Sequence, residues 1–363
     1  MPSHNEVIIA AAGGRKTTRI VERAVGATHE RAALVTYTNN NADELGRAIL
    51  RFRPSVPQHL EVMTWYTFLL HDLARPYQNA MIDKRIEGIS FVPGHSAIGV
   101  PRSNKCRFYF ANGMLIYSDK ISDFVCRSNE ASGKAVMRRL QQRFDRIYID
   151  EVQDLAGYDL DVVDMILRSN IKVTLVGDHR QSTFRTHHSK RNIQFAGRDI
   201  VKKFAEWESE GLLTRTTERE TWRSCQPIAD LADKFFPDEP TTISKNEKDT
   251  GHDGVFAIPR RAVAEYVRRY KPFILRLSKR TDTEGLDAMN YGLSKGLTVD
   301  RVLIFPHGKA IDWLKSNDFK HVEKTAEEMY VGITRARYSV TFVIDDDVGV
   351  PGVAPYDVCD ASK

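Results

Sequence analysis

The chain has 363 residues, enough for two domains, and its 42% hydrophobic and 28% charged residues exclude collagen-like and wholly disordered proteins. Its 53 Lys and Arg against 48 Asp and Glu give a formal net charge of +5. The charge is uneven, because the stretch 71–149 holds 13 basic and 7 acidic residues. This surplus indicates either an anionic partner or a solvated basic surface.

The four cysteines show neither a CxxC spacing nor a pairing rhythm, which argues against a disulfide scaffold or a zinc site. No apolar run approaches the ~18 residues of a membrane span. The first residues lack the basic segment and the sustained apolar core of a signal peptide. These features predict a cytoplasmic protein without membrane contact.

Short β-branched runs alternate with longer amphipathic stretches in the first half of the chain. The strands expected there are Val7–Ala11, Ala33–Tyr37, Glu61–Thr64, Arg146–Ile149 and Lys172–Val176. The helices expected there include Asn41–Phe52, Leu155–Arg168 and Ile200–Glu208. Such alternation favours βαβ units and a parallel sheet.

The alternation repeats after about residue 190. Strands are expected at Gly254–Ile258, Phe273–Leu277, Arg301–Phe305 and Ser339–Ile344, and helices at Ala262–Tyr270 and Lys309–Ser316. The sequence therefore predicts an α/β protein with two parallel-sheet lobes, 1–190 and 191–345. A small, basic, mainly helical insert at about 75–140 interrupts the first lobe, and 346–363 form a surface tail.

The first expected strand leads into a glycine-containing turn, Ala10–Thr18, and then into a helix. Such a turn points backbone N–H groups at a phosphate, which the helix dipole also attracts. Lys16 would reach the β- and γ-phosphates of a nucleotide, and the Thr17 hydroxyl would hold Mg²⁺. The match to GxxxxGK[ST] is imperfect, since Ala10 replaces the first glycine and Arg15, expected to be unable to adopt glycine-only backbone angles, replaces the second. A purely structural turn is the alternative.

Two acidic residues that could complete a nucleotide-binding site follow the expected strand at Arg146–Ile149. Asp150 suits a Mg²⁺ contact, and Glu151 is suited to polarise an attacking water. The alternative is that both acids cap a helix.

Eight segments in order resemble the motifs of UvrD/Rep/PcrA-type superfamily 1 helicases. They are Ala10–Thr17, Thr36–Ala42, Met63–Phe68, Asp150–Asp154 (DEVQD), Gly177–Phe184 (GDHRQSTF), Thr221–Ser224 (TWRS), Ser294–Val302 and Tyr330–Arg337 (YVGITRAR). The resemblance implies two RecA-like lobes around one ATP.

The resemblance assigns the catalytic roles to Glu151, Lys16, Gln181, Arg223 and Arg335. Arg335 would be the main arginine finger and Arg223 its partner, although surface ion pairs are the alternative for both. Nucleotide contacts fall on Gly13, Gly14, Arg15, Lys16, Thr17, Thr18, Trp222 and Gly296, and metal contacts on Thr17 and Asp150. Trp222 stands where the family stacks a tyrosine on adenine; a core position is its alternative.

The positions that the family uses for single-stranded DNA are occupied by Thr38, Asn39, Trp65, Tyr66 and Phe184. Aromatic faces stack bases without sequence preference, but a WYTF run is as often half-buried core. The basic insert would contact phosphates. Only about 70 residues separate Trp222 from Ser294, so the family's large 2B subdomain cannot fit, and the glutamine motif before the first strand is missing.

The leading hypothesis is a Mg²⁺-dependent ATPase that tracks single-stranded DNA, 3′→5′ by analogy. The second is a nucleotide- and DNA-sensing regulatory subunit that controls a partner nuclease, as in Gabija-type antiphage systems. The third is a nucleic-acid-binding scaffold in which Arg15 has disabled hydrolysis. The full set of charged motif residues argues against the third.

Overall fold

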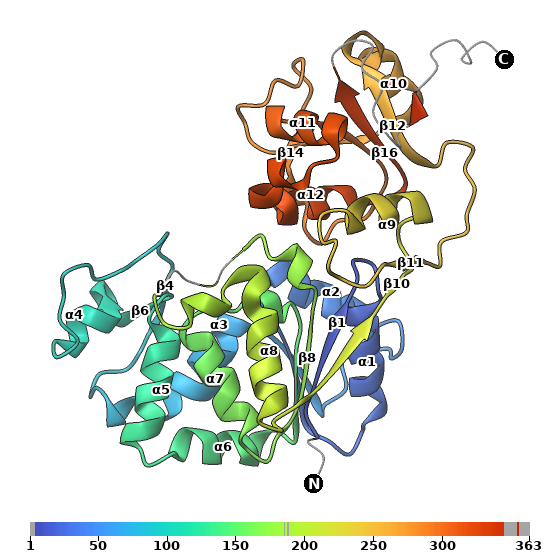
Figure 1. Cartoon of the computed structure of the whole chain (residues 1–363). Helices are drawn as coiled ribbons and strands as arrows, with labels where there is room; N and C mark the ends of the chain where they lie inside the picture. Colours follow the sequence, from blue (N-terminus) through green and yellow to red (C-terminus); the bar gives the residue numbers. More distant parts are fainter. Residues whose placement is uncertain (1–3, 185, 187–188, 345–353, 356–363) are drawn as a thin grey trace. The chain divides into compact units, whose positions relative to one another are not determined.

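The computed structural model describes residues 4–184, 186, 189–344 and 354–355. Most of the expected tail, 346–363, lies outside these residues. Contacts divide the chain into two compact units (Figure 1). Unit 1 comprises Met1–Ile9 and Lys16–Thr217, and unit 2 comprises Ala10–Arg15 and Glu218–Lys363. The glycine-containing turn after the first strand thus groups with unit 2, and the helix that follows it groups with unit 1.

Unit 1 is built on a six-stranded sheet in the order β3-β2-β7-β8-β1-β9. All the strand pairs from β3 to β1 are parallel. The strands are β1 (Glu6–Ala10), β2 (Ala32–Thr36), β3 (Leu60–Thr64), β7 (Arg146–Ile149), β8 (Lys172–Gly177) and β9 (Thr214–Glu218). The expected strands are confirmed to within a residue, because strands buried on both faces are nearly continuous apolar runs.

Helices α1 (Lys16–Gly26), α2 (Asn39–Ile49), α7 (Tyr158–Leu167) and α8 (Ile200–Ser209) complete the βα alternation of unit 1. Each buries an apolar stripe; in α1 it consists of Ile20, Val21, Ala24 and Val25. Carboxyl ends of parallel strands share one sheet edge, so the residues after β1, β2, β7 and β8 lie along the same edge.

The insert between β3 and β7 is mainly helical, as expected, and also contains a short sheet. It contains helices α3 (Trp65–Phe68), α4 (Lys105–Tyr109), α5 (Ile121–Ala131) and α6 (Ala135–Arg143), with a π-helical turn over Leu69–Ala74. It also contains a three-stranded sheet of β4 (Gly88–Ser90), β6 (Leu115–Tyr117) and β5 (Phe110–Ala111). Strands of two or three residues are too short to produce an alternating pattern, so the sequence did not reveal this sheet.

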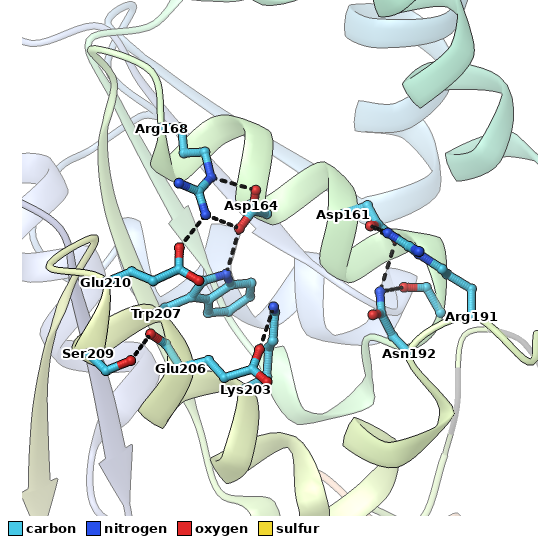
Figure 2. Close-up of polar contacts among 11 residues, drawn as sticks. Asp161, Asp164, Arg168, Arg191, Asn192, Lys203, Glu206, Trp207, Ser209 and Glu210 are labelled. Carbon is cyan, nitrogen blue, oxygen red and sulfur yellow. Dashed lines mark hydrogen bonds and ion pairs between the residues drawn. The ribbon is translucent and has the colours of Figure 1, made fainter.

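The boundary between the units lies at Thr217/Glu218, and the expected boundary near residue 190 is wrong. Ile200, Phe204 and Trp207 of α8 are buried in the same core as the strands of unit 1. Figure 2 shows polar contacts that fasten α8 and the preceding loop to α7. Trp207 Nε1 donates to Asp164 Oδ1 at 2.9 Å, and Arg191 Nη2 pairs with Asp161 Oδ1 at 2.5 Å.

Unit 2 has its own six-stranded sheet in the order β14-β13-β15-β16-β12-β17, and its strand pairs are parallel. The strands are β12 (Gly254–Pro259), β13 (Phe273–Arg276), β14 (Met289–Asn290), β15 (Val299–Phe305), β16 (Ala336–Ile344) and β17 (Ala354–Pro355). The helices are α9 (Gln226–Asp233), α10 (Val263–Tyr270), α11 (Gly308–Ser316) and α12 (Ala326–Ile333). A separate pair, β10 (Glu220–Thr221) and β11 (Ile243–Ser244), is also parallel. The expected α/β class with parallel sheets is confirmed in both units.

No helix among the described residues is both long and apolar enough to cross a membrane.

Candidate functional site

The turn between β1 and α1 is closed by a backbone hydrogen bond and requires glycine at one position. The backbone N–H of Gly14 donates to the carbonyl of Ala11 at 2.9 Å. Gly13 has φ +77°, and a Cβ there would lie 2.5 Å from the Cβ of Arg223, so only glycine fits. Arg15 has φ +57°. The expectation that Arg15 is unable to take up the required backbone is therefore wrong: the left-handed region is open to an L residue for roughly 1–2 kcal/mol.

The acids after β7 face the start of α1 within unit 1. The Thr17 hydroxyl donates to Asp150 Oδ2 at 3.0 Å, and Asp150 Oδ1 accepts the backbone N–H of Glu151 at 2.9 Å. Burial and the charge of Glu151 raise the pKa of Asp150 to about 6, while the nearby charge of Lys16 opposes the rise. Neither acid is a side-chain helix cap, because Glu151, which precedes a short helical turn, makes no capping bond.

A hydroxyl and a carboxylate that converge in this way fit Mg²⁺, which takes oxygen ligands and retains waters and substrate phosphates. The described residues contain no group of three or more His, Cys, Asp or Glu placed to hold a metal. A Thr–Asp pair that relies on phosphate oxygens needs no such group.

Gln153 and Asp178, which the sequence reasoning did not single out, hold the polar residues of unit 1 in place. The Gln153 amide donates to Glu151 Oε2, and its oxygen accepts the backbone N–H of Asp178 at 3.1 Å. Asp178 in turn accepts Gln181 Nε2 and Arg180 Nε, each at 2.9 Å. Although burial opposes it, the charges of Arg180 and Lys16 hold the pKa of Asp178 below its usual range. Gln153 lies in the DEVQD segment and Asp178 in the GDHRQ segment. These two motifs were the sequence signal from which both residues could have been identified.

The two candidate arginines of unit 2 donate to backbone carbonyls of that unit. Arg335 is 1% exposed, and its Nε donates to the carbonyl of Val331 at 2.8 Å. Arg223 is half-buried and its Nη1 donates to the carbonyl of Thr334 at 3.0 Å.

Trp222 is exposed over 43% of its surface, so the alternative that it is a core residue is wrong. The guanidinium carbon of Arg15 lies 3.6 Å from the centre of its ring. The backbone N–H of Trp222 donates to the carbonyl of Gly13 at 3.1 Å, and the Thr221 hydroxyl donates to the carbonyl of Ala12 at 2.7 Å. Trp222 and the turn are therefore bonded together in unit 2.

Thr18 lies in the first turn of α1, and Gly296 is exposed at φ +88°.

The five residues proposed to contact a nucleic acid have different environments in unit 1. Thr38 caps α2 by accepting the N–H of Asn41 at 3.2 Å, and Asn39 is exposed beside it. Tyr66 is partly exposed, and Phe184 is 36% exposed. Trp65 is 1% exposed within the core. Its side chain is not available for stacking, which corrects the assignment of Trp65 and agrees with the core alternative.

Comparison with known proteins adds a family match over part of unit 1. Residues 110–195 match the model of the UvrD/REP helicase N-terminal domain. No curated protein matches the sequence.

Solved structures with a similar arrangement include a PRRSV helicase (15% identity, TM-score 0.45, covering 95% of this chain and 55% of that one). They also include arterivirus nonstructural protein 10, a helicase, in complex with DNA (13%, 0.46, 94% and 61%) and alone (12%, 0.46, 94% and 60%). The chain thus spans about 55–61% of the length of these helicases. The matched segment of unit 1 contains Asp150, Glu151, Gln153 and Gln181.

Proposed function

We propose that the chain is a Mg²⁺-dependent ATPase that binds single-stranded DNA and translocates along it, in the 3′→5′ direction by resemblance. The observation that carries the proposal is the contact of Thr17 with Asp150, beside Lys16 and Glu151, after a phosphate-loop turn.

In this proposal Lys16 binds the β- and γ-phosphates, and Thr17 and Asp150 hold Mg²⁺, which neutralises phosphate charge when bound. Glu151 orients the attacking water and takes its proton as the water oxygen bonds to the γ-phosphorus and the bond from that phosphorus to the β–γ bridging oxygen breaks, which releases ADP and phosphate. Gln153 holds the carboxylate of Glu151 in position. Gln181 senses the γ-phosphate. The resemblance assigns to Arg223 and Arg335 the neutralisation of the negative charge on that phosphate.

Trp222 offers an exposed indole on which adenine can stack, with Arg15 as the group that adenine would displace or join. Thr38, Asn39, Tyr66 and Phe184 are the proposed contacts to DNA. All four are at least partly exposed in unit 1.

The test is ATP turnover by the purified chain with Mg²⁺, with and without single-stranded DNA. We expect turnover that DNA stimulates and that chelation of the metal removes. Glu151→Gln should reduce turnover by at least about 10²-fold while the variant still binds nucleotide, because it removes the base but keeps the size of the side chain.

The matched control is Glu22→Gln, a change of the same type at an exposed position on α1. Equal turnover by wild type and Glu151→Gln would overturn the proposal. Turnover that appears only when a co-purifying nuclease is present would instead favour the regulatory alternative, which no described contact supports at present.

A further inference from the structure

A cavity lies at the edge of the unit 1 sheet opposite the phosphate loop. It is lined by Arg31 and His59, which directly precede β2 and β3, and by Phe144, which precedes β7. These strands are parallel, so the three residues lie at the amino edge of the sheet, whereas Asp150 follows the carboxyl end of β7. The segment from Phe144 to Asp150 spans roughly 20 Å when extended. The cavity is therefore separate from the candidate nucleotide site.

The cavity is polar and has the size of a small-molecule site. Its volume is about 430 Å³, within the range of roughly 300–1,000 Å³ that ligand pockets occupy. Three arginines, Arg31, Arg139 and Arg143, line it together with Glu61 and two glutamines. Arginine side chains that gather at one cavity are typical of sites for carboxylate or phosphate groups, because the planar guanidinium matches two oxygens at once.

Acidic side chains neutralise two of these arginines within the protein. Arg31 is held by Asp145, whose Oδ1 and Oδ2 accept its Nη2 and Nε at 2.9 Å and 3.0 Å. Arg143 Nη2 pairs with Glu61 Oε2 at 2.6 Å, and its Nε pairs with Asp72 Oδ1 at 2.5 Å. Asp72 is 3% exposed and therefore forms a fixed support under the cavity wall.

Arg139 differs from the other two arginines because one edge of its guanidinium is unused. Its Nη1 donates to the carbonyl of Asp72 at 3.0 Å and lies 3.7 Å from Asp72 Oδ1. Its Nε and Nη2 have no partner among the described residues, and its side chain is 34% exposed. The N–H groups of these two nitrogens lie side by side in one plane, where arginine can bind both oxygens of a carboxylate or phosphate.

Glu61 supplies an acceptor to the same cavity. Its Oε2 is taken by Arg143, while its Oε1 has no partner in the part of the chain that the structure describes. Arg139 and Arg143 lie one turn apart on α6, so the unused donors and the unused acceptor both neighbour Arg143. This combination suits a ligand that carries an oxyanion and also hydroxyl groups.

We propose that the cavity binds a hydroxylated small molecule through its phosphate or carboxylate group. Arg139 binds two oxygens of that group, and Glu61 accepts hydrogen bonds from the hydroxyls, with the amides of Gln58 and Gln142 beside them. An acidic peptide is disfavoured, because the three lining arginines face an equal number of acids and leave no surplus charge for a multiply charged segment. This inference does not depend on the proposed ATPase activity.

The test is isothermal titration calorimetry of the full chain with glucose 6-phosphate and with citrate, each of which combines an oxyanion with hydroxyl. We expect at least one of them to bind with a millimolar or lower dissociation constant, and the tighter one identifies the group that is recognised. Arg139→Gln should weaken this binding at least about tenfold, because a bidentate, charge-assisted contact is lost. Binding of neither probe at millimolar concentration would overturn the inference.

Arg138→Gln is the matched control, because Arg138 is the exposed neighbour of Arg139 on α6 and is not among the residues that line the cavity. It should leave the affinity unchanged. Lys16→Ala should also leave it unchanged, since Lys16 belongs to the phosphate loop at the other edge of the sheet. If Lys16→Ala abolished binding and Arg139→Gln did not, the probe would occupy the phosphate loop and the inference would be wrong.

Chemical protection of the wild-type chain tests the same contact without relying on the folding of a variant. Phenylglyoxal modifies accessible guanidinium groups, and tandem mass spectrometry distinguishes the adjacent Arg138 and Arg139. At a probe concentration of about nine times the dissociation constant, mass action predicts roughly tenfold slower modification of Arg139. Modification of Arg138 should stay unchanged. Equal rates at Arg139 with and without the probe, or equal slowing at both arginines, would overturn the inference.

Discussion

Arg15 has two features with opposite effects on stability. Its left-handed backbone at φ +57° costs roughly 1–2 kcal/mol, and its stack on the exposed Trp222 ring returns about 0.5–1 kcal/mol. Glycine would remove the strain but would also give the unfolded chain more freedom, at about 0.4–1 kcal/mol. These terms nearly cancel, so selection for stability alone does not account for an arginine here.

We therefore expect Arg15→Gly to change the melting temperature little and to keep or raise ATP turnover, because it restores the glycine of the phosphate loop and uncovers Trp222. Steady-state turnover and a thermal melt are the measurements. Arg15→Ala serves as the control, since it uncovers the ring but keeps the backbone strain. Complete loss of turnover in Arg15→Gly would show that Arg15 contributes directly to catalysis.

Gln153 connects the two acidic motifs of unit 1 through both ends of its amide. Gln153→Glu places a second carboxylate against Glu151 and removes the donor that holds it. We expect kcat to fall at least about tenfold with a smaller change in KM, because water activation is affected and phosphate binding is not. The pH profile of kcat should also shift upward, since a neighbouring negative charge raises the pKa of Glu151. A variant with lower melting temperature but unchanged kcat would show that Gln153 is merely structural.

At the scale of elements, α8 decides where unit 1 ends. A chain that ends at Lys190 lacks Ile200, Phe204 and Trp207, which are 0–2% exposed in the core. Each contributes roughly 1.5–3 kcal/mol, a sum comparable with the whole stability of a domain. We expect residues 1–217 to unfold cooperatively on heating and residues 1–190 to show no cooperative transition, measured by circular dichroism.

Trp207→Phe in the full chain is the control for that comparison. It keeps an aromatic ring in the core but loses the hydrogen bond to Asp164, so we expect a loss of about 1–3 kcal/mol. If the two fragments melted alike, α8 would have to belong to unit 2.

The same elements show what the sequence could predict. Strands such as β2, whose five residues are all buried, were recognised because burial on both faces leaves only apolar residues. The three-stranded sheet of the insert was missed because its strands are two or three residues long.

Within the candidate site, the motifs located Lys16, Thr17 and Asp150, which the structure brings together. Trp65 and Tyr66 are adjacent in sequence, yet one is core and the other partly exposed, and this difference depends on how α3 packs.

At the scale of the whole molecule, two buried groups make the units respond to pH in opposite directions. In unit 2 the ring of His252 lies between those of Phe256 and Tyr270, 4.1 Å from each centre. Burial, and then the charge of Arg301, lower the pKa of His252 to about 4. In unit 1 burial and Glu151 raise the pKa of Asp150 to about 6.

The signs follow from proton binding. Between pH 6.5 and 4 the unfolded state binds a proton at His252 and the folded state does not, so unit 2 loses up to about 3 kcal/mol as the pH falls. Between pH 6 and 3.8 folded Asp150 binds a proton and the unfolded carboxyl does not. Unit 1 therefore gains stability over that range when no metal is bound. Glu30, with a pKa lowered to about 2, affects stability only below about pH 4.5.

With a chelator present, we expect the unfolding free energies of the two units of the wild type to change in opposite directions between pH 6.5 and 4.5, as followed by denaturant unfolding. His252→Phe keeps the ring stack but does not titrate, so its unfolding free energy should rise as the pH falls. Asp150→Asn should do the opposite and lose stability over the same range. Parallel pH dependences in the two variants would contradict this assignment, whereas Mg²⁺ and nucleotide should remove only the Asp150 effect, because a bound metal keeps that carboxylate ionised.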